Sequence, residues 1–128
     1  MATWTSNELN KIGKADELQI ASLQSDGTLR KAVTIWVVRL ADDLYVRSVN
    51  GRSSAWFRGV QVQHAGRIRA GGLEKDVTFV EEADPGINEK IDAAYATKYR
   101  RSPSSVEHIN SPAARNATIK LVPRPADA

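Results

Sequence analysis

The sequence predicts a mainly β domain of the α+β type: a small antiparallel barrel with an N-terminal helix and a helical insert before its last strand. Three observations predict this class. Short apolar stretches alternate with turn residues over the first two thirds of the chain, as in strands joined by hairpins. The apolar period changes from 2 to 3.6 after Asp84-Pro85-Gly86. No strand–helix–strand unit repeats, which disfavours a doubly wound parallel sheet.

The N-terminal part of the chain predicts one helix and one strand. A helix is expected over residues 6–15, because Thr5 and Glu8 have the spacing of a capping box and apolar residues recur on one face. The segment ELQIASLQ, residues 17–24, then alternates in the manner of a strand. The turn SDGT places Gly27 at the position of a hairpin that tolerates positive φ.

Residues 29–40, LRKAVTIWVVRL, predict the strongest strand, because they are β-branched, aromatic and apolar on both faces. One face would carry Val33, Ile35 and Val37, and the other Ala32, Trp36 and Val38. A strand buried on both sides lies centrally in a sheet. We therefore expect one face to line the barrel core and the other to lie under a helix or a partner subunit.

The remaining elements follow in order. The strand LYVRSV pairs back after the turn ADD, and a short helix or turn then carries Trp56 and Phe57. We expect a hairpin over residues 66–82, a helix over 87–100, a shorter helical piece within 102–112, a last strand at 117–123 and a flexible tail at 124–128. The whole chain, residues 1–128, is expected to form a single domain.

Composition limits the possible functions. Apolar residues make up 41% and charged residues 26% of the chain, as in ordinary soluble proteins. The chain has no cysteine, which excludes disulfides, thiolate metal sites and a cysteine nucleophile and fits a reducing cytoplasm. No leader peptide or membrane span is apparent, so a cytoplasmic location is expected. His64 and His108 do not have zinc-ligand spacing, so no metal site is expected.

The net charge is only +3, but the charges are unevenly distributed. No Asp or Glu occurs from Leu44 to Leu73, whereas five arginines do: Arg47, Arg52, Arg58, Arg67 and Arg69. Such a stretch predicts a local positive potential that attracts anions. The alternative is that these arginines are solvated or paired with distant carboxylates. Nucleic-acid binding is less favoured, because few aromatic residues interleave with the arginines and the total charge is low.

The segment YVRSVNGRSSAW, residues 45–56, is the first candidate site. Exposed amides of its glycine turn can form an anion-binding nest. Planar cations, hydroxyls and a flat ring occur there together, in Arg47, Arg52, Ser48, Ser53, Ser54 and Trp56. The alternative is that Asn50-Gly51 is only a tight turn, with Trp56 in the core and the arginines solvated.

Two further candidates lie outside that loop. If residues 29–40 form one strand that pairs with 44–49, Arg30 and Lys31 lie at the same end of the sheet as Arg52. Tyr95 and Tyr99 are four residues apart on a helix and share a face, where they would either cover a ligand or pack in the core.

The sequence identifies no catalytic residue. It has no phosphate-binding glycine motif, no nucleophile elbow and no zinc-protease motif. Whether the protein is an enzyme stays open at this point. If it is one, a bound cofactor is the better candidate for the chemistry.

Residues 27–59, GTLRKAVTIWVVRLADDLYVRSVNGRSSAWFRG, resemble the core of the flavin and deazaflavin reductase superfamily, whose members have the pyridoxamine-phosphate-oxidase-like split β-barrel. Nearly the whole chain, residues 3–124, resembles a bacterial family of uncharacterised proteins within that superfamily. The blocks that carry this closer resemblance are TIWVVR, LYVRS-NG, RI-AGG--KDV-F, AAY--KY and the closing AT-KL-PR.

The resemblance implies a homodimer that holds FMN or a deazaflavin coenzyme at the subunit interface and reduces an unknown small molecule. Basic residues before the long strand and the serine-glycine loop would hold the phosphate arm. In this sequence they are Arg30, Lys31, Ser48, Asn50, Gly51 and Arg52, with Trp56 near the ring or packed below it. The residue pattern itself adds Arg47 as a cofactor-binding candidate and Tyr95 and Tyr99 as substrate-binding candidates. The alternative is a cofactor-free module that binds another small anion on the same fold, or whose Tyr95 helix fills the cleft.

Overall fold

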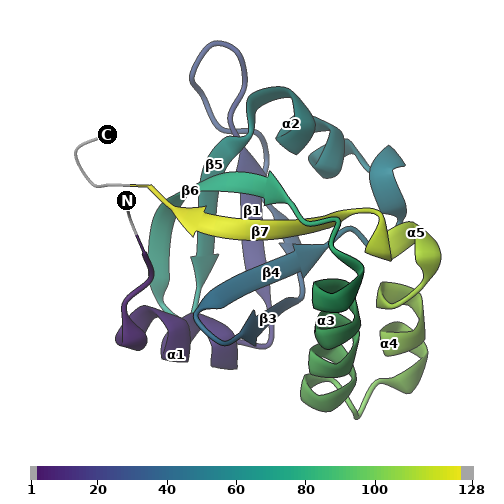
Figure 1. Ribbon diagram of the computed structural model, residues 1–128. Helices are drawn as coiled ribbons and strands as arrows, with labels where there is room; N and C mark the ends of the chain where they lie inside the picture. Colours follow the sequence, from purple (N-terminus) through teal and green to yellow (C-terminus); the bar gives the residue numbers. More distant parts are fainter. Residues whose placement is uncertain (1–2, 125–128) are drawn as a thin grey trace.

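Seven antiparallel strands make one sheet, in the order β2-β1-β5-β6-β7-β4-β3, in the part of the chain that the computed structural model describes, residues 3–124 (Figure 1). The strands are β1 (Leu18–Ser22), β2 (Val33–Ile35), β3 (Val37–Leu40), β4 (Asp43–Arg47), β5 (Ala65–Ala70), β6 (Leu73–Glu81) and β7 (Thr118–Pro123). The helices are α1 (Ser6–Lys14), α2 (Ala55–Gln63), α3 (Pro85–Lys98), α4 (Pro103–Ile109) and α5 (Pro112–Arg115), with a 3-10 turn at Gly51–Ser53.

The two ends of this sheet are consecutive pieces of one segment. β2 pairs with β1, with Ile20 opposite Val33, whereas β3 pairs with β4, with Val37 opposite Val46. Only Trp36 separates β2 from β3, so the first and last strands of the sheet meet there and the sheet curls into a nearly closed barrel. This confirms the expected fold class, an antiparallel split β-barrel with an N-terminal helix and a helical insert before β7.

The expectation of one uninterrupted strand over residues 29–40 was wrong. Val37 and Val38 of β3 are fully buried on opposite faces, as expected for a strand covered on both sides. Val33 in β2, however, is 36% exposed, and Thr34 is exposed as well. The physical reason is the bend at Trp36, because it moves the first half of the segment away from β4 and onto β1.

The barrel interior is filled with apolar side chains. Leu9 and Ile12 of α1 enter this core, and Phe57 and Val60 of α2 also pack into it. The indole N–H of Trp4 donates to the carbonyl of Leu121, 3.0 Å away, and so joins the N-terminal segment to β7. Since the interior is packed, a ligand would have to bind outside the barrel.

A second apolar cluster lies on the outer face of β3 and β4. Val38 and Tyr45 of these strands pack against Ile91, Tyr95 and Tyr99 of α3. Figure 1 shows α3 and α4 side by side, with α5 leading from them into β7. The sequence predicted α3 and α4, but it did not predict α5 as a separate turn of helix.

Both ends of the described chain make hydrogen bonds within the protein. The capping box at Thr5 and Glu8 forms as expected, with Thr5 Oγ1 accepting from the Glu8 N–H at 3.1 Å. Arg124 donates its N–H to the carbonyl of Asp76, and the rest of the expected tail, residues 125–128, lies outside the described residues. Within residues 3–124, no helix is both long enough and apolar enough to cross a bilayer.

Gly66 of β5 tests the close packing of the barrel. A Cβ at this position would lie 2.1 Å from the carbonyl oxygen of Ala21 in β1. Because moving the paired backbone to make room costs energy, we expect Gly66→Ala to lower the free energy of unfolding by about 2 kcal/mol or more, as measured by urea denaturation. Gly27 has φ +87, but a Cβ there would meet nothing within 4 Å, so Gly27→Ala should cost only about 1 kcal/mol. Equal losses in the two variants would contradict this account.

Candidate functional site

A cavity lies outside the barrel, where the bend at Trp36 meets the loop after β4 and the helical insert. It has a volume of about 630 Å³, within the usual range for ligand sites. The segment Val33–Trp36 forms one part of its wall, and α4 contributes Ser105 and His108 to another. We call this space the Trp36 cavity.

The loop after β4 and the start of α2 supply the polar end of the Trp36 cavity, which Ser48, Asn50, Ser54 and Trp56 line. Ser48 Oγ lies 2.7 Å from the Gly51 carbonyl oxygen and 2.7 Å from Ser54 Oγ. Gly51 has φ +78, so glycine suits this turn. The Ser54 side chain does not cap α2, which leaves the N–H groups of the first turn of α2 available to an anion.

Two tryptophans border the same cavity. Trp36 stacks on Tyr99 with ring centroids 3.8 Å apart and planes 2° apart, so one face of its indole is covered. Trp56 packs edge-to-face on Phe57, with centroids 5.9 Å apart. The sequence indicated Trp56 as a site residue but placed Trp36 only on one face of a strand. The bend that exposes Trp36 depends on pairing with both β1 and β4, which no local pattern encodes.

Arg47 has a different role from the one expected from the sequence. Its side chain is completely buried, and its guanidinium donates to Asp92 Oδ1 at 2.6 Å, among other acceptors. The further acceptors are Asn88 O and Oδ1, Ile109 O, Asn110 Oδ1 and Thr118 Oγ1. These groups come from α3, the end of α4 and β7, so Arg47 links the insert to the barrel and has no donor directed at a ligand.

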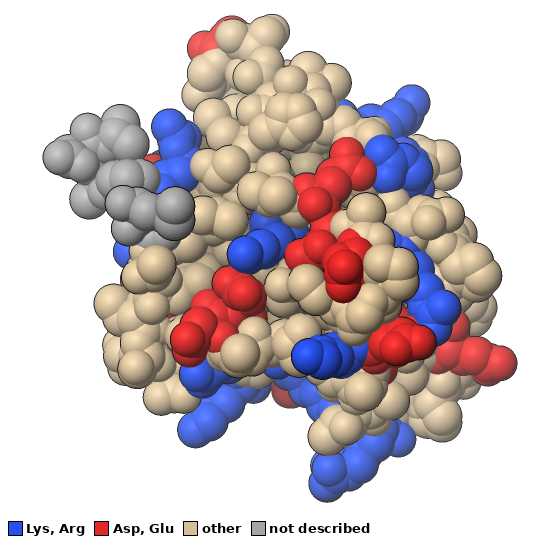
Figure 2. Space-filling view, viewed as in Figure 1, with Lys and Arg blue, Asp and Glu red and all other residues tan. Residues whose placement is uncertain are grey.

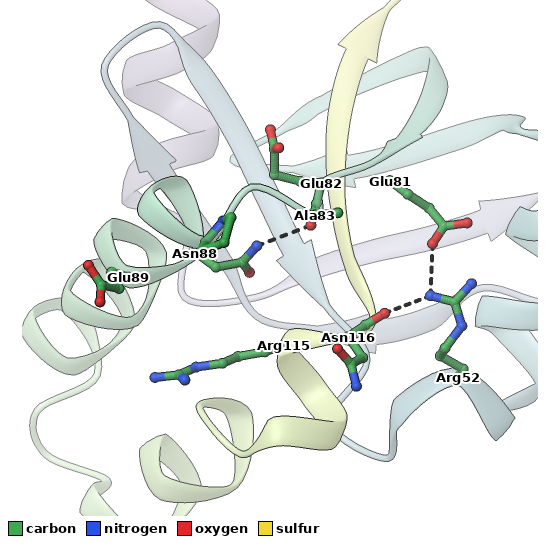
Figure 3. Close-up of a pocket in the computed structure, with 9 residues that line it drawn as sticks. Arg52, Glu81, Glu82, Ala83, Asn88, Glu89, Arg115 and Asn116 are labelled. Carbon is green, nitrogen blue, oxygen red and sulfur yellow. Dashed lines mark hydrogen bonds and ion pairs between the residues drawn. The ribbon is translucent and has the colours of Figure 1, made fainter.

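Arg52 lies in a second cavity, of about 420 Å³, formed by the end of β6, the start of α3 and α5 (Figure 3). Its guanidinium donates to Glu81 Oε1 at 2.8 Å and to the Asn116 carbonyl at 2.7 Å, as the dashed lines in Figure 3 show. Glu82 and Glu89 also line this cavity, so Arg52 faces carboxylates there. Arg52 therefore lines this second cavity and not the Trp36 cavity, whereas Arg47 lines the Trp36 cavity with its donors already bonded to protein acceptors.

Other arginines of the acid-free stretch also have carboxylate partners. Arg67 Nε lies 2.8 Å from Asp76 Oδ1, and Arg69 Nη2 lies 2.9 Å from Glu74 Oε2. Both pairs are directly opposite in the β5–β6 hairpin register. Figure 2 shows acidic and basic side chains intermixed on the viewed face rather than one continuous basic area. The expected positive field is therefore largely neutralised locally.

Arg30 and Lys31 do not line the Trp36 cavity of their own chain. Arg30 packs against Gly59 of α2 and borders a small cavity of about 150 Å³ on the outer face of β1 and β5. The sequence placed this pair level with Arg52 on the assumption of a continuous strand. Because the segment bends at Trp36, residues before β2 follow β1 instead.

Tyr95 and Tyr99 lie in the outer apolar cluster, behind Trp36, and do not line the cavity. The Tyr95 hydroxyl donates to the Trp36 carbonyl at 3.3 Å, and the Tyr99 hydroxyl donates to the Asp16 carbonyl at 2.7 Å. Burial raises the pKa of Tyr99 to about 12 and raises the pKa of Tyr95 further. Of the two alternatives left open by the sequence, this placement favours core packing, and Tyr99 supports the indole of Trp36.

Comparison with known families gives a match over most of the chain. Residues 8–121 match a family described as an uncharacterized protein conserved in bacteria, DUF2255. The chain belongs to this bacterial family. The expectation from the sequence blocks is thus confirmed. Among curated proteins none matches the chain.

Solved structures confirm the split-barrel fold. A candidate pyridoxamine 5′-phosphate oxidase from Listeria innocua has 19% identity and a TM-score of 0.67, over 91% of this chain and 90% of that one. The heme storage protein HutZ from Vibrio cholerae has 12% identity and a TM-score of 0.66, over 98% and 93%. An F420-H2-dependent reductase has 12% identity and a TM-score of 0.60, over 84% and 93%. At these identities the likeness establishes the fold alone.

The contrast between two arginines tests the assigned role of Arg47. Removing its guanidinium in Arg47→Met leaves buried acceptors without donors, so we expect a loss of about 3–5 kcal/mol in unfolding free energy. The exposed Arg52–Glu81 pair is the matched control, and Arg52→Met should cost less than about 1 kcal/mol. Chemical denaturation measures both variants. If Arg47→Met lowers the unfolding free energy no more than Arg52→Met does, Arg47 does not link the insert to the barrel.

Proposed function

We propose that the protein binds a flavin-type cofactor, FMN or a deazaflavin, in the Trp36 cavity and acts as a small oxidoreductase. One observation carries the proposal: the cavity combines the indoles of Trp36 and Trp56 with the hydroxyls of Ser48 and Ser54, at the start of a helix whose first N–H groups have no side-chain cap. That combination suits a planar ring with an anionic arm. Structural neighbours that include an F420-H2-dependent reductase support the same choice.

Different residues of this chain would contact different parts of the cofactor. Ser48, Asn50 and Ser54, with the first amides of α2, would hold the phosphate arm, as the sequence predicted for the first two. Trp56 would border the cofactor ring and keep water from it, which leaves the uncovered face of Trp36 to the substrate. A bound flavin or deazaflavin supplies hydride transfer, and the protein supplies orientation. The reaction would take place in the cytoplasm, a location that the absence of cysteine favours.

We further propose that the active form is a homodimer with the Trp36 cavity near its interface. Two apolar side chains that line the cavity are partly exposed in the single chain, Val33 at 36% and Val49 at 46%. Arg30 and Lys31, which have no place in the cavity of their own chain, are then the proposed source of positive charge for the phosphate arm. In this dimer the cofactor would contact the residues expected from the sequence, except Arg47 and Arg52, whose guanidinium groups bond to protein acceptors.

The alternative function, a cofactor-free module that binds another small anion, has one observation in its favour. The guanidinium groups of Arg47 and Arg52 are both occupied by acceptors of the protein, so less positive charge faces the cavity than the sequence predicts. The two functions predict different absorbance spectra, because a bound flavin or deazaflavin absorbs visible light and a colourless anion does not. Absorbance of freshly purified protein separates them.

Titration with FMN and riboflavin tests the cofactor site, because the two share a ring and differ in the phosphate. In Asn50→Asp the added carboxylate repels the phosphate, so FMN affinity should fall about tenfold or more while riboflavin affinity changes little. Asn116→Asp is the control, since Asn116 lines the other cavity. Flavin fluorescence measures the affinities, with a deazaflavin in a parallel titration. Absence of saturable binding by both cofactor types would reject the proposal.

Sedimentation analysis tests the dimer. A charge placed in the proposed interface should dissociate it, so we expect Val33→Asp and Val49→Asp to sediment as monomers at micromolar concentration. Val62 is 69% exposed and does not line the Trp36 cavity, so Val62→Asp should leave the mass unchanged. A monomeric native protein, or a dimer unaffected by both substitutions, would contradict this arrangement.

A further inference from the structure

His108 is the one ionisable side chain in the lining of the Trp36 cavity that has no hydrogen bond within residues 3–124. The other ionisable residue there is Arg47, whose guanidinium is fully occupied. No Asp or Glu lines this cavity in the described chain. A ligand there would therefore find a free imidazole and no competing carboxylate.

The position of His108 is set by the Arg47 network. The next residue, Ile109, is 4% exposed, and its carbonyl accepts from Arg47 Nη1 at 3.3 Å. Asn110 Oδ1 accepts from the same nitrogen at 3.0 Å, and the Asn110 amide in turn donates to the Asp92 carbonyl. The end of α4 is thus tied to the barrel, which holds the exposed imidazole of His108 at the cavity wall. Ser105, three residues earlier on α4, lines the same wall.

The opposite wall favours a flat ring. Tyr99 covers one face of the Trp36 indole, so the remainder of the indole is the surface that borders the cavity. The hydroxyl of Tyr99 is itself fixed on the Asp16 carbonyl, so the indole has a rigid backing. A planar aromatic group packs well against such a surface at little conformational cost.

We propose that the Trp36 cavity recognises its substrate as a small planar aromatic acid, with the ring against Trp36 and an acidic oxygen accepting a hydrogen bond from His108. This inference rests on the proposed function, because substrate and cofactor would share one cavity. An imidazole N–H can donate to a carboxylate or phenolate oxygen, and its protonated form adds attraction of opposite charges. His108 is then a substrate-binding residue contributed by the helical insert.

A matched pair of ligands tests this role. The probes are 2-naphthoate and 2-naphthalenemethanol, which share the ring and differ in the charge of the side group. Tryptophan fluorescence measures binding, because Trp36 and Trp56 both line the cavity. We expect the native protein to bind the naphthoate about tenfold more tightly than the alcohol, the size typical of a hydrogen bond to a charged group.

Three variants assign that preference to His108. His108→Phe keeps a flat side chain without a donor, so it should bind the two probes equally, with unchanged affinity for the alcohol. His108→Gln keeps a donor and should retain part of the preference. His64→Asn, at the exposed end of α2 and outside the cavity lining, should behave as the native protein does. The variants lie at exposed positions, and circular dichroism checks their folding.

The outcomes separate this inference from the proposed function. It is overturned if the native protein shows no saturable naphthoate binding, if it binds both probes equally, or if His108→Phe keeps the preference. An FMN titration on the same samples reports on the cofactor independently. FMN binding with no effect of His108→Phe rejects the inference alone. A preference that depends on His108, without binding of FMN or of a deazaflavin in a parallel titration, supports acid recognition and rejects the cofactor.

Discussion

The buried guanidinium of Arg47 is the interaction on which the arrangement of this protein depends. A charge removed from water is tolerated only when its hydrogen bonds are satisfied, and here the acceptors come from three separate parts of the chain. Thr118 belongs to β7, Asp92 to α3, and Asn110 follows α4. Satisfying one side chain therefore fixes how the helical insert lies against the barrel, and with it where α4 faces the loop after β4.

The cavity arises from a second constraint, the closure of the barrel at Trp36. Because β2 and β3 bond to opposite ends of the sheet, the chain must bend between them, and the indole at the bend cannot join the filled interior. It stacks on Tyr99 instead, in the cluster that also attaches α3. The interior core, the outer cluster and the Arg47 network thus meet at one place, and the space left between them is where the loop 48–54 and α4 face each other.

The order of charged residues along the sequence does not predict the electrostatic potential of the folded protein. The stretch from Leu44 to Leu73 has no acid, yet Arg47 pairs with Asp92 and Arg52 with Glu81, from segments that are distant in sequence. The pairs in the β5–β6 hairpin could be anticipated from strand register, whereas those two could not. The lining of the Trp36 cavity consequently presents hydroxyls and the imidazole of His108 rather than unpaired guanidinium groups.

The sequence by itself determined the elements whose causes are local: the capped helix α1, the hairpins, the change to helical period after Asp84, and the family to which the chain belongs. It also identified Ser48, Asn50 and Trp56, because a glycine turn brings near neighbours together. Only the tertiary structure decided the bend at Trp36, the burial of Arg47 and the presence of His108 at the cavity. Each of these results from contacts between residues far apart in the chain, whose energies depend on packing and desolvation that no short pattern of residues contains.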